Sequence, residues 1–237
     1  MRRLLVAFAV LAAACGAPAQ APQQPKLKIV ISVDQLTPEL LTEYRTQLRG
    51  GLGHVAAQPS FAEGTVTGQK IAVSGRSTGV DAAATSRWFW NGTSFATDVA
   101  GAVAPRTVPL ANSGVQKLLS SPEPALVSPP YCAAKAKPGG KRFARAAGDY
   151  PGFTASPSLD GATLALAAGL IQDFKLGRDA APDLLTIDLA ATGAVAQTYG
   201  SGSEEMCLDL FALDRELGDF VRALDLMKLD YSIELKR

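Results

Sequence analysis

Short apolar runs rich in β-branched residues alternate along this chain with segments of helical periodicity. Residues 27–33 (LKIVISV) and 184–189 (LLTIDL) are the clearest runs. Their nearly continuous hydrophobicity is typical of strands that are buried on both faces of a parallel sheet. Strand–helix alternation therefore predicts an α/β fold, with a mainly parallel sheet sandwiched by helices. Apolar residues make up 47% of the 237 residues, which is enough for such a core.

The other elements are predicted from periodicity and from capping residues. Thr37 is placed to cap a helix over residues 38–48, and Ser158 or Asp160 to cap another over residues 161–174. Further elements are a long amphipathic helix over residues 204–226 and short strands over residues 70–73 and 230–235. In open parallel sheets, ligands bind outside the carboxyl ends of the strands. Asp34, residues 74–76 and residues 190–200 are therefore the segments to watch.

The middle of the chain is less regular, and residues 86–150 are predicted to form an irregular insertion. Within it, residues 87–95 (RWFWNGTSF) predict a hairpin whose aromatic residues pack across it, with Asn91-Gly92 as a type I′ turn. Residues 105–148 are rich in Pro, Ala, Gly and Lys. They carry a small basic cluster, which is either a solvated loop or an anion-attracting rim. The cluster consists of Lys135, Lys137, Lys141, Arg142 and Arg145.

The first residues predict export. Two arginines precede an apolar run over residues 4–14, which is too short to span a bilayer, and an Ala-Pro-Ala triplet then suits cleavage. Residues 1–19 are thus predicted as a signal peptide, residues 20–26 as a linker and residues 27–237 as the domain. Cys15 follows three alanines and offers an alternative, a lipid-anchored product. Either product is periplasmic or extracellular, and no later segment predicts a transmembrane helix.

Charge and cysteine content narrow the possible functions. The chain has 23 basic and 22 acidic residues, a net charge of +1, which argues against a general nucleic-acid binder. His54 is the single histidine, so a zinc site built from several histidines is excluded. After cleavage at residue 19, Cys132 and Cys207 are the remaining cysteines. In an oxidising compartment they either pair or stay as two buried thiols, and their spacing does not decide between the two.

Several segments, in order, are similar to one known family. They are Ile29–Gln35, Arg87–Phe95, Arg142–Asp149, Ala155–Asp160, Lys175–Gly177 with Ala181–Asp183, Thr198–Cys207 and Leu213–Phe220. Together they resemble bacterial alkaline phosphatases of the broad-specificity, phosphate-irrepressible type, over most of residues 27–231. The resemblance implies an alkaline-phosphatase-like core and hydrolysis of phosphate monoesters with two zinc ions, which activate the attacking oxygen and stabilise the leaving one. It also implies a threonine nucleophile, Asp and His metal ligands, and a lysine and an arginine that hold the phosphoryl oxygens.

Carried over residue by residue, this site is largely lost. Asp34 matches the first metal ligand of the family. Arg76 keeps a positive charge at the place of the phosphate-binding lysine, whereas Thr78 stands at the place of the arginine. In the second metal-binding segment, Gly193 and Gln197 occupy the places of an aspartate and a histidine.

The remaining parts of the family site have no counterpart. The loop with the nucleophilic threonine is missing between the first helix and residues 70–75, and His54 is not at a ligand position. An Asp-His-Gly ligand pair should follow residues 230–235, where Lys236 and Arg237 end the chain.

The sequence therefore predicts a truncated and degenerate relative without catalytic residues of its own. Asp34 is its one expected metal ligand and Arg76 its one expected phosphate contact, so that binding of the two zinc ions is doubtful. The alternatives are a non-catalytic exported protein that binds phosphate or another anion, and a gene remnant without a function.

Overall fold

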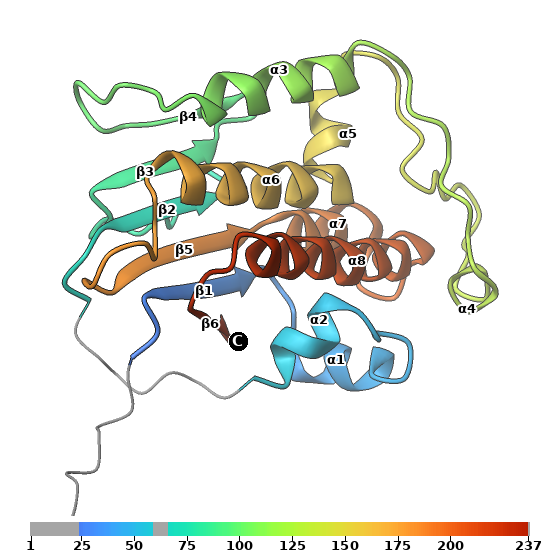
Figure 1. Cartoon of the computed structure of the whole chain (residues 1–237). Coiled ribbons are helices and arrows are strands. Elements are labelled where there is room, and N and C mark those ends of the chain that lie inside the picture. The colour runs from blue at the N-terminus through green and yellow to red at the C-terminus, as the bar shows by residue number, and fades with distance from the viewer. Residues whose placement is uncertain (1–23, 59–65, 237) are drawn as a thin grey trace, which may run out of the picture.

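The structure, a computed structural model, describes residues 24–58 and 66–236. The expected signal peptide, Cys15 and most of the expected linker lie outside these residues. Within them, six strands form one sheet in the order β4-β3-β2-β5-β1-β6 (Figure 1). The strands are β1 (Leu27–Val33), β2 (Lys70–Ser74), β3 (Ser86–Trp90), β4 (Phe95–Ala96), β5 (Asp183–Leu189) and β6 (Tyr231–Lys236). All neighbours pair in parallel except β3 and β4, so the α/β fold with a mainly parallel sheet is confirmed.

The helices follow the strands in the expected alternation. They are α1 (Pro38–Tyr44), α2 (Gly51–Ala56), α3 (Thr107–Leu119), α4 (Pro130–Ala133), α5 (Tyr150–Thr154), α6 (Pro157–Asp173), α7 (Ala191–Tyr199) and α8 (Glu204–Leu226). Thr37 caps α1 as predicted, because its hydroxyl accepts the amide of Leu40 at 3.2 Å. The bounds of α8 are those predicted from its amphipathic pattern. No helix in the described ranges is both long and apolar enough to cross a membrane.

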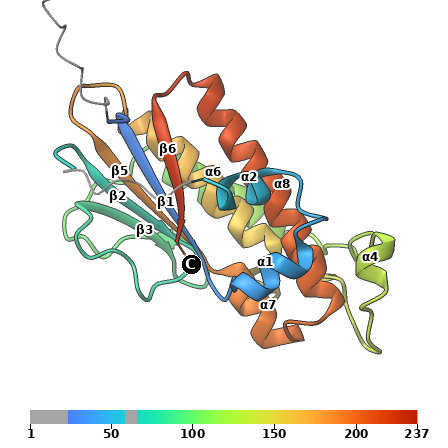
Figure 2. The ribbon, with the colours of Figure 1, turned by 90° about the horizontal axis from the view of Figure 1, so that it is seen from below.

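The two faces of the sheet differ. Side chains at odd-numbered positions of the central strands, such as Ile31 and Ile187, are fully buried, and α6 and α2 contact this face. Figure 2 shows the labelled helices on one side of the sheet. The sequence predicts helices on both faces, but the even-numbered positions Ser32, Thr186 and Asp188 are only partly buried. Polar groups at every second position keep contact with water, and this alternation is hidden by the high apolar content of the runs.

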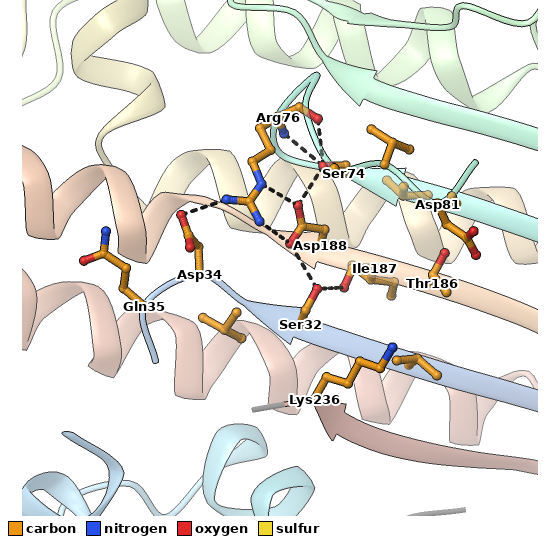
Figure 3. Close-up of a pocket in the computed structure, with 16 residues that line it drawn as sticks. Ser32, Asp34, Gln35, Ser74, Arg76, Asp81, Thr186, Ile187, Asp188 and Lys236 are labelled. Atoms are coloured by element: carbon orange, nitrogen blue, oxygen red, sulfur yellow. Dashed lines mark hydrogen bonds and ion pairs between the residues drawn. The ribbon is translucent and has the colours of Figure 1, made fainter. Parts of the chain in front are cut away.

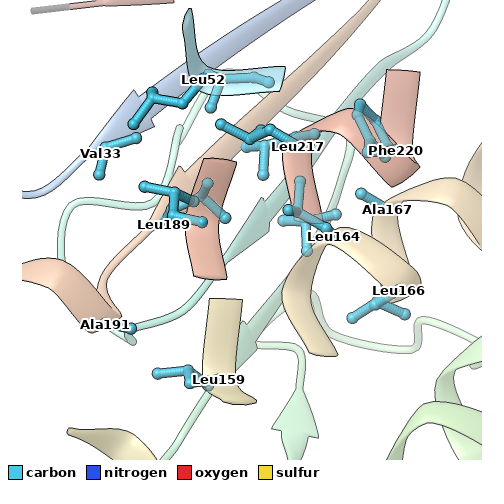
Figure 4. Close-up of a cluster of buried hydrophobic side chains, with 14 of the residues drawn as sticks. Val33, Leu52, Leu159, Leu164, Leu166, Ala167, Leu189, Ala191, Leu217 and Phe220 are labelled. Carbon is cyan, nitrogen blue, oxygen red and sulfur yellow. The ribbon is translucent and has the colours of Figure 1, made fainter. Parts of the chain in front are cut away.

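Layers of aliphatic side chains join the helices to the covered face of the sheet (Figure 4). Val33 and Leu189, from the ends of β1 and β5, belong to the same buried cluster as Leu52 of α2 and Leu217 of α8. Leu52, Leu189 and Leu217 have no exposed surface. Burial of one such side chain stabilises the fold by roughly 1.5–3 kcal/mol. The ends of β1 and β5 carry the polar residues described below. Their positions are thus fixed by packing against the helices.

The structure differs from the sequence predictions in the turn of the hairpin, the start of α6 and the presence of α3. The hairpin of β3 and β4 is confirmed, and the rings of Trp90 and Phe95 meet edge to face at 5.6 Å. The type I′ turn is wrong, because residues 91–94 connect the strands and Asn91 Oδ1 accepts the amides of Thr93 and Ser94. The capping role of Ser158 or Asp160 is also wrong, because α6 begins earlier, at Pro157. Helix α3 lies in a segment whose composition predicted no helix.

Cys132 and Cys207 form a disulfide with an S–S distance of 2.05 Å. The bridge joins α4 to α8, and 75 positions separate the two cysteines in the sequence. It therefore settles the choice between a bridge and two buried thiols, which spacing left open. It also ties the irregular middle of the chain to the longest helix.

Candidate functional site

Three polar side chains form a row across the sheet where β1, β5 and β2 end. The strand register places Ser32 beside Asp188 and Asp188 beside Ser74. Both serine hydroxyls donate to the Asp188 carboxylate, each over 3.0 Å (Figure 3). Asp34 follows β1, and its amide donates to the carbonyl oxygen of Leu189 at 2.9 Å. Two carboxylates from neighbouring strands thus meet at the carboxyl edge of the sheet, the expected place for a ligand site.

Arg76 lies between these two carboxylates. Its Nη1 is 2.9 Å from Asp34 Oδ2, and its Nε is 2.9 Å from Asp188 Oδ2. Nη2 also donates to Asp188 Oδ1 at 3.3 Å, so Asp188 receives the two-pronged contact that suits a guanidinium. The main chain of Arg76 is fixed as well, because its amide donates to Ser74 Oγ at 3.1 Å.

This ion-pair cluster lies at the surface and is partly exposed. The exposed fractions of the side chains are 40% for Arg76, 26% for Asp34 and 15% for Asp188. Partial burial works against the charged form of Arg76, but the charges of Asp188 and Asp34 outweigh it and raise the pKa of the guanidinium above its usual value. Arg76 therefore keeps its positive charge in this cluster.

Gly193, in the first turn of α7, packs against the Asp34 carboxylate. A Cβ atom added at this glycine would lie 2.1 Å from Asp34 Oδ2, so no larger residue fits while Asp34 is placed as it is. Gln197, one turn further along α7, is exposed to solvent. The family resemblance implies metal ligands at these two positions. Gly193 has no side chain to offer, and the amide of Gln197 is not a ligand that zinc prefers.

A cavity of about 410 Å³ opens beside the cluster on the sheet face with the half-buried side chains. Its charged lining residues are Asp34, Asp81, Asp188, Arg76 and Lys236. Three carboxylates face two cations, which leaves a net charge of −1 when all are ionised. Every nitrogen of the Arg76 guanidinium already contacts a carboxylate. The cavity thus carries charged groups, but their net charge does not favour an anion.

The other residues singled out from the sequence lie elsewhere. His54 is exposed on α2, with its Nε2 3.2 Å from Gln58 Nε2, and it does not line the cavity. In the basic cluster, Lys135 pairs with Glu43 at 2.5 Å, and the Arg145 side chain is 2% exposed and donates to the carbonyl of Leu118. The expected nucleophile segment overlaps residues 59–65, outside the described residues.

Asp188 is the site residue that sequence reasoning missed. It lies in the run 184–189, whose nearly continuous hydrophobicity predicts a strand buried on both faces. The available signal was the pair Thr186 and Asp188, two polar residues at alternate positions of an apolar strand. Period-two polarity of this kind marks a face that is not covered.

The donors at this edge do not fit a two-zinc centre. A catalytic zinc ion needs about three protein ligands and an open position. No group of three or more His, Cys, Asp or Glu side chains within residues 24–58 and 66–236 is arranged to hold a metal ion. Asp34 and Asp188 are both engaged by Arg76. Asp34 as a metal ligand and Arg76 as a phosphate contact therefore stay predictions.

Comparisons with known proteins give related sequences and a related fold. No model of a protein family matches the chain. Alkaline phosphatase PhoK of Sphingomonas sp is 36% identical over 156 residues, and alkaline phosphatase PhoD of Zymomonas mobilis is 37% identical over 159 residues. Each alignment covers 62% of this chain but only 28% and 27% of the relatives. The chain thus spans less than a third of the length of these relatives.

Solved structures share the architecture over nearly the whole chain. The crystal structure of wild-type alkaline phosphatase PafA superposes with a TM-score of 0.68 at 17% identity, covering 91% of this chain and 63% of PafA. A PafA variant gives a TM-score of 0.65 at 18% identity with the same coverage. At this identity the likeness establishes the fold alone.

Proposed function

Because this chain belongs to the alkaline phosphatase family by sequence and by fold, we propose that it keeps the scaffold of a phosphate-monoester hydrolase without the two-zinc chemistry. One observation carries the proposal. Asp34, which the resemblance implies as a zinc ligand, is engaged by Arg76 at 2.9 Å and is closed in by Gly193. Zinc would have to displace the guanidinium, and among the described residues no histidine lines the cavity.

The absence of two-zinc chemistry is the reason to expect no activity. In a two-zinc phosphatase the metals lower the pKa of the attacking oxygen and neutralise charge on the leaving oxygen, which together supply much of the rate enhancement. Here the cation between Asp34 and Asp188 is a guanidinium, and each of its nitrogens contacts a carboxylate. The chain by itself therefore has no phosphomonoesterase turnover. Phosphate binding at Arg76, the alternative function, is disfavoured by the net negative lining of the cavity.

Export is part of the proposed function. The amino-terminal pattern of arginines, an apolar run and an Ala-Pro-Ala triplet predicts secretion. The Cys132–Cys207 disulfide supports this independently, because such bridges form and persist in oxidising compartments.

Hydrolysis of p-nitrophenyl phosphate by the purified chain tests the proposal. We expect no release of nitrophenol above the protein-free rate, with or without zinc added, in an assay in which a family relative is active. Asp34→Asn should change nothing. Asp98→Asn, which alters a carboxylate paired with Arg87 far along the chain from Asp34, is the matched control. Zinc-dependent turnover that is lost in Asp34→Asn and kept in Asp98→Asn would refute the proposal.

A further inference from the structure

The carboxyl edge of the sheet carries an unusual concentration of oxygen donors. Asp34 and Asp188 lie on either side of one guanidinium, and the hydroxyls of Ser32 and Ser74 both point at Asp188. Two carboxylates this close raise each other's free energy unless a cation lies between them. In many proteins that cation is a metal ion, which prefers such oxygen ligands.

The contacts of Arg76 reproduce what such an ion would do. One fixed positive charge contacts both carboxylates, at 2.9 Å from Asp34 and 2.9 Å from Asp188. The planar fork of the guanidinium spans the two groups, which a lysine ammonium could do only as a point charge. Because arginine does not lose its proton in proteins, the charge is permanent.

The surrounding main chain holds the arginine in this position. The Arg76 amide is bound by Ser74 Oγ, and a Cβ at Gly75 would lie 3.1 Å from Ala190, so the turn after β2 is seated against the start of α7. On the opposite side, Gly193 leaves Asp34 the space it occupies. The position of Arg76 between the two carboxylates is therefore fixed by contacts of its main chain and of its neighbours, and not by its side chain alone.

We propose that Arg76 is a resident cation, which replaces a divalent metal ion in joining the ends of β1, β5 and β2. The inference rests on the proposed function, since it starts from the same misfit with a two-zinc centre. It goes further because it assigns the guanidinium a positioning role, in which Asp188 is the second carboxylate that Arg76 binds. Without Arg76, no cation would lie between Asp34 and Asp188, and the cavity lining would keep three carboxylates against Lys236. A lining with that net negative charge attracts cations.

Substitution of Arg76 tests this with manganese as the probe, because Mn²⁺ suits carboxylate and hydroxyl oxygens and is counted directly by electron paramagnetic resonance. The wild-type chain should not bind Mn²⁺, and its melting temperature should be the same in EDTA and in excess Mn²⁺. Arg76→Gln should melt at a lower temperature in EDTA, and Mn²⁺ should restore it. Its affinity for Mn²⁺ should exceed that of the wild type by at least tenfold. Arg76→Gln combined with Asp188→Asn should lose the gained binding.

Arg87→Gln is the matched control, because Arg87 also makes a two-pronged pair, with Asp98, away from the cluster. It should gain no Mn²⁺ binding. If Arg76→Gln does not fold in EDTA, Mn²⁺ should restore a cooperative melt. Mn²⁺ binding by the wild type, or an Arg76→Gln chain that neither binds Mn²⁺ nor is rescued by it, would overturn the inference. None of these readouts measures turnover, so the proposed function can fail while the resident cation stands.

Discussion

Oδ2 of Asp34 lies only 2.1 Å from the position that a Cβ atom of residue 193 would take. The same oxygen is 2.9 Å from Arg76 Nη1. The absence of a side chain at Gly193 and the ion pair at Asp34 are thus two aspects of one arrangement. Gly193 and Arg76 both lie against the Asp34 carboxylate, so a larger residue at position 193 has to move that carboxylate away from Arg76.

Gly193→Ala should destabilise the chain by about 1–3 kcal/mol, the usual cost of overpacking a filled site. The added methyl group displaces Asp34 from Arg76, and this outweighs the gain in helix propensity, which is at most about 1 kcal/mol. Urea unfolding measures the difference. Gly114→Ala is the control, because Gly114 lies in α3 with nothing within 4 Å of the added atom. It should be neutral or stabilising, and an equal loss in both variants would contradict the role of Asp34.

Removal of the disulfide should lower the free energy of unfolding by up to ~4 kcal/mol, from the chain entropy released when a long loop is opened. The double substitution Cys132→Ser with Cys207→Ser tests this, because the bridge closes a sequence separation of 75. Urea unfolding with and without a reducing agent measures it. The reductant should destabilise the wild type and leave the double variant unchanged. If the reductant has no effect on the wild type, the bridge does not contribute.

Stability should fall as the pH rises from about 5 to 8, because buried carboxyl groups of α6 and α8 hold their protons. Burial raises the pKa of Asp209 to about 7, although the hydroxyl of Thr192 donates to it, and raises the pKa of Glu216 to about 8. Burial and the neighbouring Asp209 raise the pKa of Asp160 well above its ordinary value. In this window the unfolded chain has released protons that the folded chain still binds, so higher pH favours unfolding.

The slope is at most ~1.4 kcal/mol per pH unit for each such group, and stability should level off above the folded pKa values. Urea unfolding at pH 5, 6, 7, 8 and 9 measures it. Asp209→Asn should reduce the slope of stability against pH between pH 5 and 7 by up to the contribution of one titrating group, ~1.4 kcal/mol per pH unit. Asp98→Asn, a change at the exposed Arg87 pair, should keep the wild-type slope. Constant stability from pH 5 to 8 would show that these carboxyls titrate normally.

Asp214 of α8 anchors the start of α2, and its loss should cost about 1–3 kcal/mol. Its carboxylate accepts the amide of Gly50 at 2.7 Å and the amide of Gly53 at 3.1 Å. Asp214→Ala leaves both amides without this partner, which thermal unfolding detects. Asp219→Ala, on the same helix, should change stability by less than about 0.5 kcal/mol, because its pair with Arg222 is exposed. Equal effects of the two variants would contradict the anchoring role.

Elements whose signals are local could be predicted from the sequence. The β-branched runs at β1 and β5, the cap at Thr37 and the periodicity of α8 each depend on neighbouring residues only, and all three are confirmed. Turn geometry after Asn91 was missed, because it depends on how β4 pairs. Helix α3 was missed, because its composition resembles that of a loop.

The chemical character of the site depends on contacts between distant parts of the chain. Asp34, Arg76 and Asp188 are separated by long stretches of sequence, and only the strand order β2-β5-β1 brings their side chains together. A residue type states which charge is available, but the distance between two charges decides whether they bind a ligand or each other. Here Arg76 lies within 2.9 Å of two carboxylates, so the fold turns an expected metal ligand and an expected phosphate contact into one ion-pair cluster.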